Sequence, residues 1–402
     1  MSSPEPTRSR RSLSPATLAC ALAIALAATA SPAEDADHGL HLHPSLSLRG
    51  VFDDNVFLED DRTSDFALWI APRLQADYAN GPLRAGLDAG ADLRRYRHET
   101  SLNEDFGRVS GFGELDLTRG LTLRLANSYV PYPERLGLPE DDSENLVQTN
   151  RAEAELRYRR PFRRESSVQF ALEAVHFTTG RFSASVDEDG DGIAETVDDF
   201  HGDFLETKFQ TEVQRGLGRR ALVFARAGMR RRNFDELSNS DFNEYSSLLG
   251  LQVRWPARLE LDATAGYGYV DFDDLDAKDR FLGTARLKWE GPRGFTWQAS
   301  AENRFTSDAT GQDFTETTAR FGIGKQLGKR MHANLEFAWS RFDDDGSDHG
   351  SDTFRVVSVR LRRQVTRHLQ VALGYRHWHN GGNDSTRDFD QNRAILEFVY
   401  AR

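Results

Sequence analysis

The chain has 402 residues, of which 51 are basic and 63 acidic, so its formal net charge is −12. This acidity argues against nucleic-acid binding, which needs a basic surface. Charged residues make up 28% of the chain and only one long apolar run occurs, near the start, so the composition excludes a helical membrane protein.

The first 33 residues predict a cleaved signal peptide. Three arginines precede the apolar run ATLACALAIALAATASPA, which has the length of a signal-peptide core and is too short to span a membrane comfortably. Small residues allow cleavage after residue 30 or residue 33. Cys20 lies inside this run, so the mature chain would have no disulfide, thiolate metal site or cysteine nucleophile. We expect the remainder, 34–402, to form one domain.

From residue 41 onward, apolar and polar residues alternate in segments that each end in a turn, which is the pattern of β-strands with one apolar face. In RAEAELRYRR (151–160), for example, Ala152, Ala154 and Leu156 oppose charged residues. We expect eighteen strands, at 42–52, 65–78, 83–97, 105–118, 121–131, 147–160, 166–178, 203–215, 221–234, 242–255, 258–272, 280–290, 295–306, 313–327, 331–342, 353–365, 368–379 and 389–400.

The connections between these strands alternate in length. Short turns such as 119–120 alternate with long acidic loops such as 179–203. This pattern predicts an all-β fold, an antiparallel up-and-down barrel in the outer membrane of a Gram-negative bacterium. Sixteen strands are the alternative, because the first strand contains Pro44 and the strands at 105–118 and 313–327 are rich in glycine. Either number leaves room for an aqueous lumen.

Aromatic residues recur beside the acidic loops. Six strands that descend from these loops begin with the dipeptide Asp-Phe, with the phenylalanines at Phe66, Phe106, Phe204, Phe242, Phe314 and Phe389. Rings placed at the feet of the loops predict an aromatic girdle at the membrane interface.

The start of the predicted barrel resembles the putative β-barrel porin 2 family. The resemblance is carried by Asp53-Asp54-Asn55 after the first strand, by the SDF opening of the second strand and by Pro72 within it. Members of that family are often encoded beside capsule or exopolysaccharide machinery. The resemblance therefore implies a role in polysaccharide export and a polysaccharide-export machinery as partner, and it brings no catalytic residues.

One acidic loop has the spacing of a calcium site. Carboxylates and one backbone carbonyl at positions 1, 3, 5, 7, 9 and 12 could converge on one hard cation, around a glycine turn at position 6. These positions are Asp187, Asp189, Asp191, Ile193, Glu195 and Asp198. A solvated acidic turn is the alternative. An EF-hand sensor is excluded, because its flanking helices and a glutamate at position 12 are missing.

Two histidines and the serines are further candidate chemical sites. His377 and His379 share one strand face and could chelate a metal weakly, but no third ligand has a fixed relation to them, which favours simple interfacial histidines. A lipid hydrolase would need a serine or threonine nucleophile beside a histidine, and no spacing or G-x-S-x-G motif predicts such a pair. We therefore expect no enzyme.

If the apolar strand faces contact lipid, the charged faces line the lumen. Cross-strand ion pairs could hold this wall together, or ladders of charge could select solutes, and the Trp69 ring could let sugars slide. The sequence predicts a porin-like conduit for polar solutes, in contact with outer-membrane lipid and lipopolysaccharide. The alternative is a non-conducting structural or adhesion barrel whose acidic loops bind calcium or surface polymers. The predicted lumen arginines are Arg73, Arg84, Arg94, Arg124, Arg157, Arg159, Arg254, Arg286, Arg360, Arg362 and Arg376.

Overall fold

The computed structural model describes most of the chain after residue 38. The described residues are 39–58, 62–133, 146–163, 166–179, 183–186, 195–198, 204–234, 241–256, 258–272, 277–307, 313–344, 351–382 and 388–401. The predicted signal peptide lies outside them, and so do Asp187, Asp189, Asp191 and Ile193 of the predicted calcium loop.

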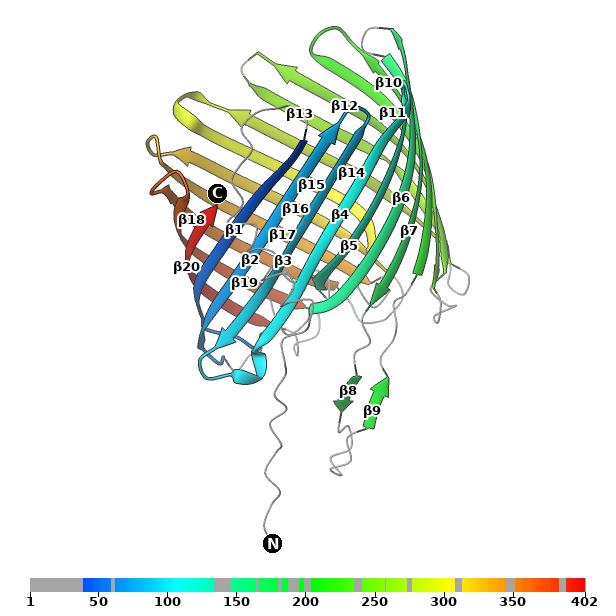
Figure 1. Ribbon diagram of the computed structural model, residues 1–402. Helices are drawn as coiled ribbons and strands as arrows, with labels where there is room; N and C mark the ends of the chain where they lie inside the picture. The colour runs from blue at the N-terminus through cyan, green and yellow to red at the C-terminus, as the bar shows by residue number, and fades with distance from the viewer. Residues whose placement is uncertain are drawn as a thin grey trace.

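Within these ranges, eighteen strands form one antiparallel sheet that closes on itself, because β1 pairs with both β2 and β20 (Figure 1). The sheet confirms the eighteen-stranded barrel and excludes the sixteen-stranded alternative. Every predicted strand end lies within three residues of the observed one. The strands are β1 (Gly39–Asp53), β2 (Asp65–Asn80), β3 (Leu83–Tyr96), β4 (Glu104–Thr118), β5 (Leu121–Pro133), β6 (Leu146–Arg163), β7 (Ser166–Thr179), β10 (Phe204–Gly216), β11 (Ala221–Phe234), β12 (Phe242–Trp255), β13 (Leu259–Phe272), β14 (Lys278–Glu290), β15 (Phe295–Ser307), β16 (Asp313–Gln326), β17 (Met331–Asp344), β18 (Ser351–Gln364), β19 (Leu369–Gly382) and β20 (Phe389–Ala401).

Two further short strands lie between β7 and β10. β8 (Ser183–Val186) and β9 (Glu195–Asp198) pair as a separate antiparallel hairpin, with Val186 opposite Glu195. The hairpin projects beyond the strand ends of the barrel (Figure 1). The alternation pattern did not predict it, because four-residue strands inside an acidic loop give too short a signal.

The barrel has a loop end and a turn end. The connections at the turn end are as short as 81–82 and 119–120, whereas those at the loop end include 54–64 and 97–103. The turn at 119–120 needs glycine, since Gly120 has a φ of 99° and a side chain there would overlap the carbonyl oxygen of Arg159. None of the described helices, η1 (Thr100–Leu102) and η4 (Pro292–Gly294) among them, is long and apolar enough to cross a membrane.

Alternate residues of each strand face outward and inward. The outward positions carry the exposed large apolar side chains, such as Leu68, Phe209, Leu249 and Leu373, which are 43%, 46%, 70% and 59% exposed. The register places the charged residues on the other face of the same strands. This face is concave: Arg360 of β18 reaches past β19 and contacts Glu397 of β20. The charged face is therefore the interior wall.

The aromatic girdle predicted from the Asp-Phe dipeptides is wrong for most of these rings. Phe204, Phe242 and Phe389 lie on interior positions of β10, β12 and β20 and are at most 8% exposed, and Phe106 shares the interior face with Arg94. Only Phe66 of the described set faces outward with an exposed ring, 46%. The reason is the two-residue period: the dipeptide does not show which of its two positions faces the lumen, and β2 and β16 both begin with its aspartate yet place the next position on opposite faces.

Candidate functional site: the interior wall and its loop end

All eleven predicted arginines lie on interior positions of their strands, as the pairing registers show. Arg73 pairs with Ser45, Arg286 with Ser300 and Arg362 with His332, and each partner is itself an interior residue. Their partners differ. Arg73, Arg159, Arg286 and Arg362 form no ion pair with any described residue. Their effect on solutes stays a prediction.

On the β3–β5 side of the wall, arginines and carboxylates alternate across neighbouring strands. Arg84 lies 2.6 Å from Glu114 and 3.2 Å from Asp116, and Arg124 lies 4.0 Å from the same Glu114. The guanidinium of Arg124 also stacks 4.7 Å from the centre of the Phe112 ring, and this ring covers the interior glycine Gly86. This part of the wall is locally neutral and held by cross-strand contacts.

Two more of the predicted arginines belong to similar local pairs. Arg157 contacts Glu155 at 2.6 Å within β6, and Arg254 of β12 lies 3.6 Å from Glu260 of β13. The Arg254–Glu260 contact is exposed to the lumen, so it contributes little to stability. Glu155 is mostly covered, and Arg157 donates to both of its carboxylate oxygens.

A recess opens in the wall formed by β17–β20 and β1. Its volume is about 290 Å³, and its lining includes Arg49, Arg360, Arg362 and Arg376. Glu397, whose side chain is 4% exposed, accepts hydrogen bonds from Arg49 (2.8 Å) and Ser47 (3.1 Å) and contacts Arg360. Gly374 lies between Arg360 and the β20 strand in the register and leaves room for the long arginine side chain. The recess therefore has more positive than negative groups.

Trp69 does not offer a surface on which sugars could slide. Its ring is an interior residue but only 7% exposed, and Arg94 and Arg49 lie 4.7 Å and 6.0 Å from its centre. Arg94 is itself 4% exposed and also stacks on Phe106 at 5.3 Å. The prediction that sugars slide on the Trp69 ring is therefore wrong, because Trp69 and Arg94 belong to a packed cluster beneath the loops.

The segment that follows β1, residues 54–58, turns inward and closes part of the loop end. Val56 is 4% exposed and belongs to an apolar cluster with Val51, Ala67, Trp69, Tyr96 and Leu102. Leu58 packs against a second interior cluster, formed by Phe342, Phe354, Trp378 and Phe389. One short segment thus joins the packed interiors of β1–β3 and β17–β20, and it narrows this end of the barrel.

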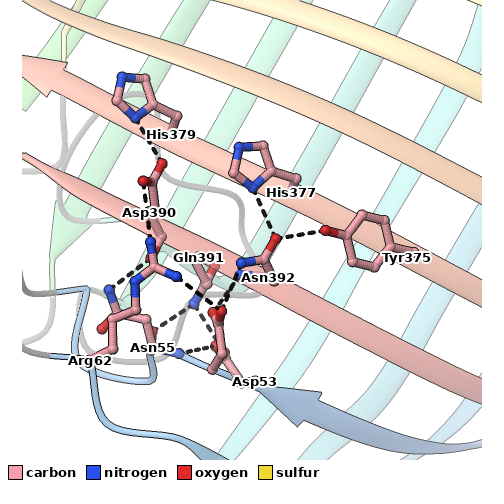
Figure 2. Close-up of polar contacts among 10 residues, drawn as sticks. Asp53, Asn55, Arg62, Tyr375, His377, His379, Asp390, Gln391 and Asn392 are labelled. Carbon is pink, nitrogen blue, oxygen red and sulfur yellow. Dashed lines mark hydrogen bonds and ion pairs between the residues drawn. The ribbon is translucent and has the colours of Figure 1, made fainter.

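Polar contacts fasten this segment to β20 (Figure 2). Gln391 donates from Nε2 to the Asp53 carboxylate and to the Asn55 carbonyl oxygen, both at 3.0 Å. Asn55 is fully buried and donates from Nδ2 to the Asp390 carbonyl oxygen at 2.9 Å. Arg393 donates to the Asp53 carboxylate at 2.6 Å. We call Asp53, Asn55, Gln391 and Arg393 the mouth latch.

The latch was missed by the sequence analysis, and so were several interior arginines. Arg49, Arg320 and Arg393 lie on the same interior face as the predicted ones, and the alternation alone would have found them. The latch itself gives no such signal, since Asp53 and Gln391 are 338 residues apart and meet only because β1 closes the barrel against β20.

The predicted calcium ligands are only partly within the described residues. Glu195 and Asp198 are the two ends of β9, and the other four residues lie outside the described ranges. No group of three or more histidine, cysteine, aspartate or glutamate side chains suited to a metal occurs in the described part of the chain. Calcium binding stays a prediction.

Comparisons with known proteins agree with this architecture. The model of one family, described as putative beta-barrel porin 2, matches residues 40–402. The chain belongs to this family. No curated protein matches the sequence. As a member of a porin family with a porin-type barrel, the protein resides in the bacterial outer membrane, where its loop end is extracellular and its turn end periplasmic.

Solved porin structures share the fold. OccK9 (OpdG) of Pseudomonas aeruginosa is 14% identical, with 90% of this chain and 98% of that chain covered and a TM-score of 0.52. OccK2 (OpdF) of the same organism, solved in complex with glucuronate, gives the same identity, coverage and TM-score. OccAB4 of Acinetobacter baumannii is 10% identical over 91% of this chain and 99% of that chain, with a TM-score of 0.50. Likeness at this identity concerns the fold alone.

Proposed function

We propose that this porin-family barrel conducts polar solutes and favours anions. Most carboxylates of the interior have an arginine partner, but several arginines have no carboxylate partner among the described residues. Arg286 of β14, Arg320 of β16 and Arg362 of β18 are exposed to the lumen in this state. Glu336 is the exposed interior carboxylate without an ion pair among the described residues, against the four exposed unpaired arginines Arg159, Arg286, Arg320 and Arg362. This difference carries the proposal, since fixed charges lining a pore bias which ions enter it.

The spacing of these arginines suits small carboxylated solutes. In the register, Arg286 and Arg320 flank Ser300, so their backbones lie two strand spacings apart, about 10 Å. Arg362 lines the 290 Å³ recess with Arg49 and Arg360. Guanidinium groups bind carboxylates through paired hydrogen bonds. Sugar acids are thus the first solutes to test, and glucuronate, which a barrel of this fold binds, is a suitable probe.

The decisive experiment measures single-channel conductance and the reversal potential in a salt gradient, for the folded protein in a planar bilayer. Arg362→Gln should shift the reversal potential toward cation preference. Arg363→Gln is the matched control, because this neighbouring residue faces outward on the same strand and should change nothing. Absence of conductance from folded protein would refute the conduit and favour the non-conducting adhesion barrel.

The family resemblance extends the proposal to polysaccharide export. Deletion of the gene from its host should then lower surface polysaccharide and leave polymer in the periplasm. Unchanged surface polymer, together with slower uptake of small anions, would refute the export role and retain the conduit.

A further inference from the structure

We propose that the outward face of β17–β20, near its extracellular end, binds the phosphate groups of lipopolysaccharide. The proposal concerns the lipid-facing surface and not the lumen, so it stands independently of the conduction proposal. The site consists of Arg355, His377 and His379, with Trp339 beside them; we call it the outer-face site. It is contiguous, because Arg355 pairs with Trp339 on one side and with His379 on the other.

Arg355 differs from most other outward arginines near the loops, although Arg97, opposite Phe66, is another exposed one without a side-chain ion pair to a described residue. Arg95 contacts Asp105 at 2.6 Å, Arg341 contacts Asp343 at 2.8 Å, and Arg231 donates to Asn233 at 3.0 Å. Arg355 is exposed and has no ion pair or hydrogen bond to any described residue through its side chain. An arginine on the lipid face is costly unless it lies at an interface, where an anionic headgroup can compensate it.

The position of Arg355 along its strand places it at such an interface. Val357, Val359 and Leu361 follow it on the same outward face, and Arg363 ends this apolar stretch. The eight residue steps from Arg355 to Arg363 span about 26 Å along the strand. With the usual strand tilt of roughly 35–45°, this rises about 20 Å, a little less than the apolar band of about 25 Å, so each long arginine side chain can extend to the nearer edge of the band. The two arginines therefore mark its two edges, and Arg355 marks the edge facing lipopolysaccharide.

The two histidines are held in place by residues of β20 (Figure 2), and the register places His379 opposite Arg355. His379 contacts Asp390 through Nδ1 at 2.8 Å, and His377 contacts the Asn392 amide oxygen through Nδ1 at 3.0 Å. Each ring thereby keeps Nε2 for another partner. Below them, Tyr375 donates from its hydroxyl to the same Asn392 oxygen at 2.6 Å, an aromatic body at the depth where acyl chains begin.

The neighbouring carboxylates are already engaged. Asp390 contacts both His379 and Arg62, at 2.8 Å and 3.2 Å, and Asp54 contacts Arg62 at 3.4 Å and accepts from the Asn392 side chain at 2.7 Å. Asp343 is paired with Arg341. Among the described residues, the guanidinium of Arg355 is thus the charge of this surface without an ion pair, and a phosphate is the anion that the outer leaflet supplies there.

The test is binding of bisphosphorylated lipid A to the full-length folded protein in detergent, measured by native mass spectrometry. Wild type and Arg363→Gln should bind equally well, whereas Arg355→Gln should bind about tenfold more weakly, the loss expected for one charge-assisted hydrogen bond. Dephosphorylated lipid A should bind weakly to all three proteins. The substituted side chains are exposed, and retained heat-modifiability on gels would verify folding.

Three results would overturn the proposal. Equal lipid A affinity of Arg355→Gln and wild type would remove Arg355 from the site. Equal binding of dephosphorylated lipid A would remove the phosphate. Binding of phosphatidylglycerol as tight as that of lipid A, and equally sensitive to Arg355→Gln, would show a general site for anionic lipids. Conductance should be the same in Arg355→Gln and wild type, so a failure here is distinct from a failure of the conduit.

Discussion

Replacing Gln391 by leucine should release the segment 54–58 from the interior wall while the barrel stays folded. Gln391 is 1% exposed, and its amide makes two hydrogen bonds of 3.0 Å, one to the Asp53 carboxylate and one to the Asn55 carbonyl oxygen. A bond to a charged group contributes about 1.5–3 kcal/mol and a neutral one about 0.5–1.5 kcal/mol. Leucine keeps the volume and removes both, so the closed latch should lose about 2–4 kcal/mol.

Hydrogen–deuterium exchange measures this loss of latch stability directly. In the latched state the Val56 amide donates to the Thr63 carbonyl oxygen at 2.9 Å, and the Asp54 amide to the Asn392 carbonyl oxygen at 3.1 Å. A local opening that becomes easier by about 2–4 kcal/mol should lower protection of these amides by roughly 30-fold to 1,000-fold. Amides in the middle of β11 and β12 should keep their protection.

Gln370→Leu is the matched control, because Gln370 is an interior glutamine at the other end of the neighbouring strand β19. It should leave protection of the 54–58 segment unchanged. Unchanged protection in Gln391→Leu would refute the latch, and equal losses in both variants would mean that interior glutamines stabilise the whole barrel rather than this segment.

Three further predictions concern packing, charge and calcium. Trp378→Ala should cost about 3–5 kcal/mol in urea unfolding because the ring is fully buried and packs 4.8 Å from Phe389, whereas Trp255→Ala, at an outward residue 41% exposed, should cost less; equal losses would contradict the interior packing. Glu397→Gln should shift the reversal potential further toward anions and cost about 1–3 kcal/mol, because Arg49 and Arg360 lose their shared carboxylate; an unchanged potential would place this recess outside the conducting path. Asp189→Ala with Asp191→Ala should abolish calcium-induced protease protection of residues 179–203, and a wild-type loop without such protection would end the calcium hypothesis.

The strands could be read from the sequence because one-sided burial imposes a two-residue period that persists for more than ten residues. The same period fixed the interior position of Arg84 or Arg362 once one residue of the strand was assigned to lipid. It failed at the strand starts. Phe204 and Phe389 belong to the same Asp-Phe pattern as Phe66 but face inward, because the dipeptide alone does not show which of its two positions faces the lumen.

Contacts between strands that are distant in the chain could not be predicted from the sequence, for a different reason. The partner of Asp53 depends on which strand closes the barrel beside β1, and on a register that places Arg393 directly opposite. A shift of two residues would keep every apolar side chain facing lipid, so hydrophobicity alone does not choose between such registers. The buried polar groups of the latch do choose, because Asp53 and Gln391 would be left without partners inside the wall.

The contacts of the mouth latch explain the residue types at Asp53, Asp54 and Asn55, the three residues after the first strand that carry the family resemblance. Asp53 ends β1 facing inward and pairs with Arg393, Asp54 turns outward to the Asn392 amides, and Asn55 starts the inward segment with its side chain buried. Asp53, Asp54 and Asn55 each need a different environment. Because successive residues at the end of a strand face inward and outward in turn, the three side chains reach these environments in the order of the sequence. In this chain, Asp53-Asp54-Asn55 thus helps to set how the barrel closes and how its extracellular mouth is narrowed. The arginines that we propose to select solutes lie elsewhere on the interior wall, so we expect barrels with the same closure to differ in what they conduct.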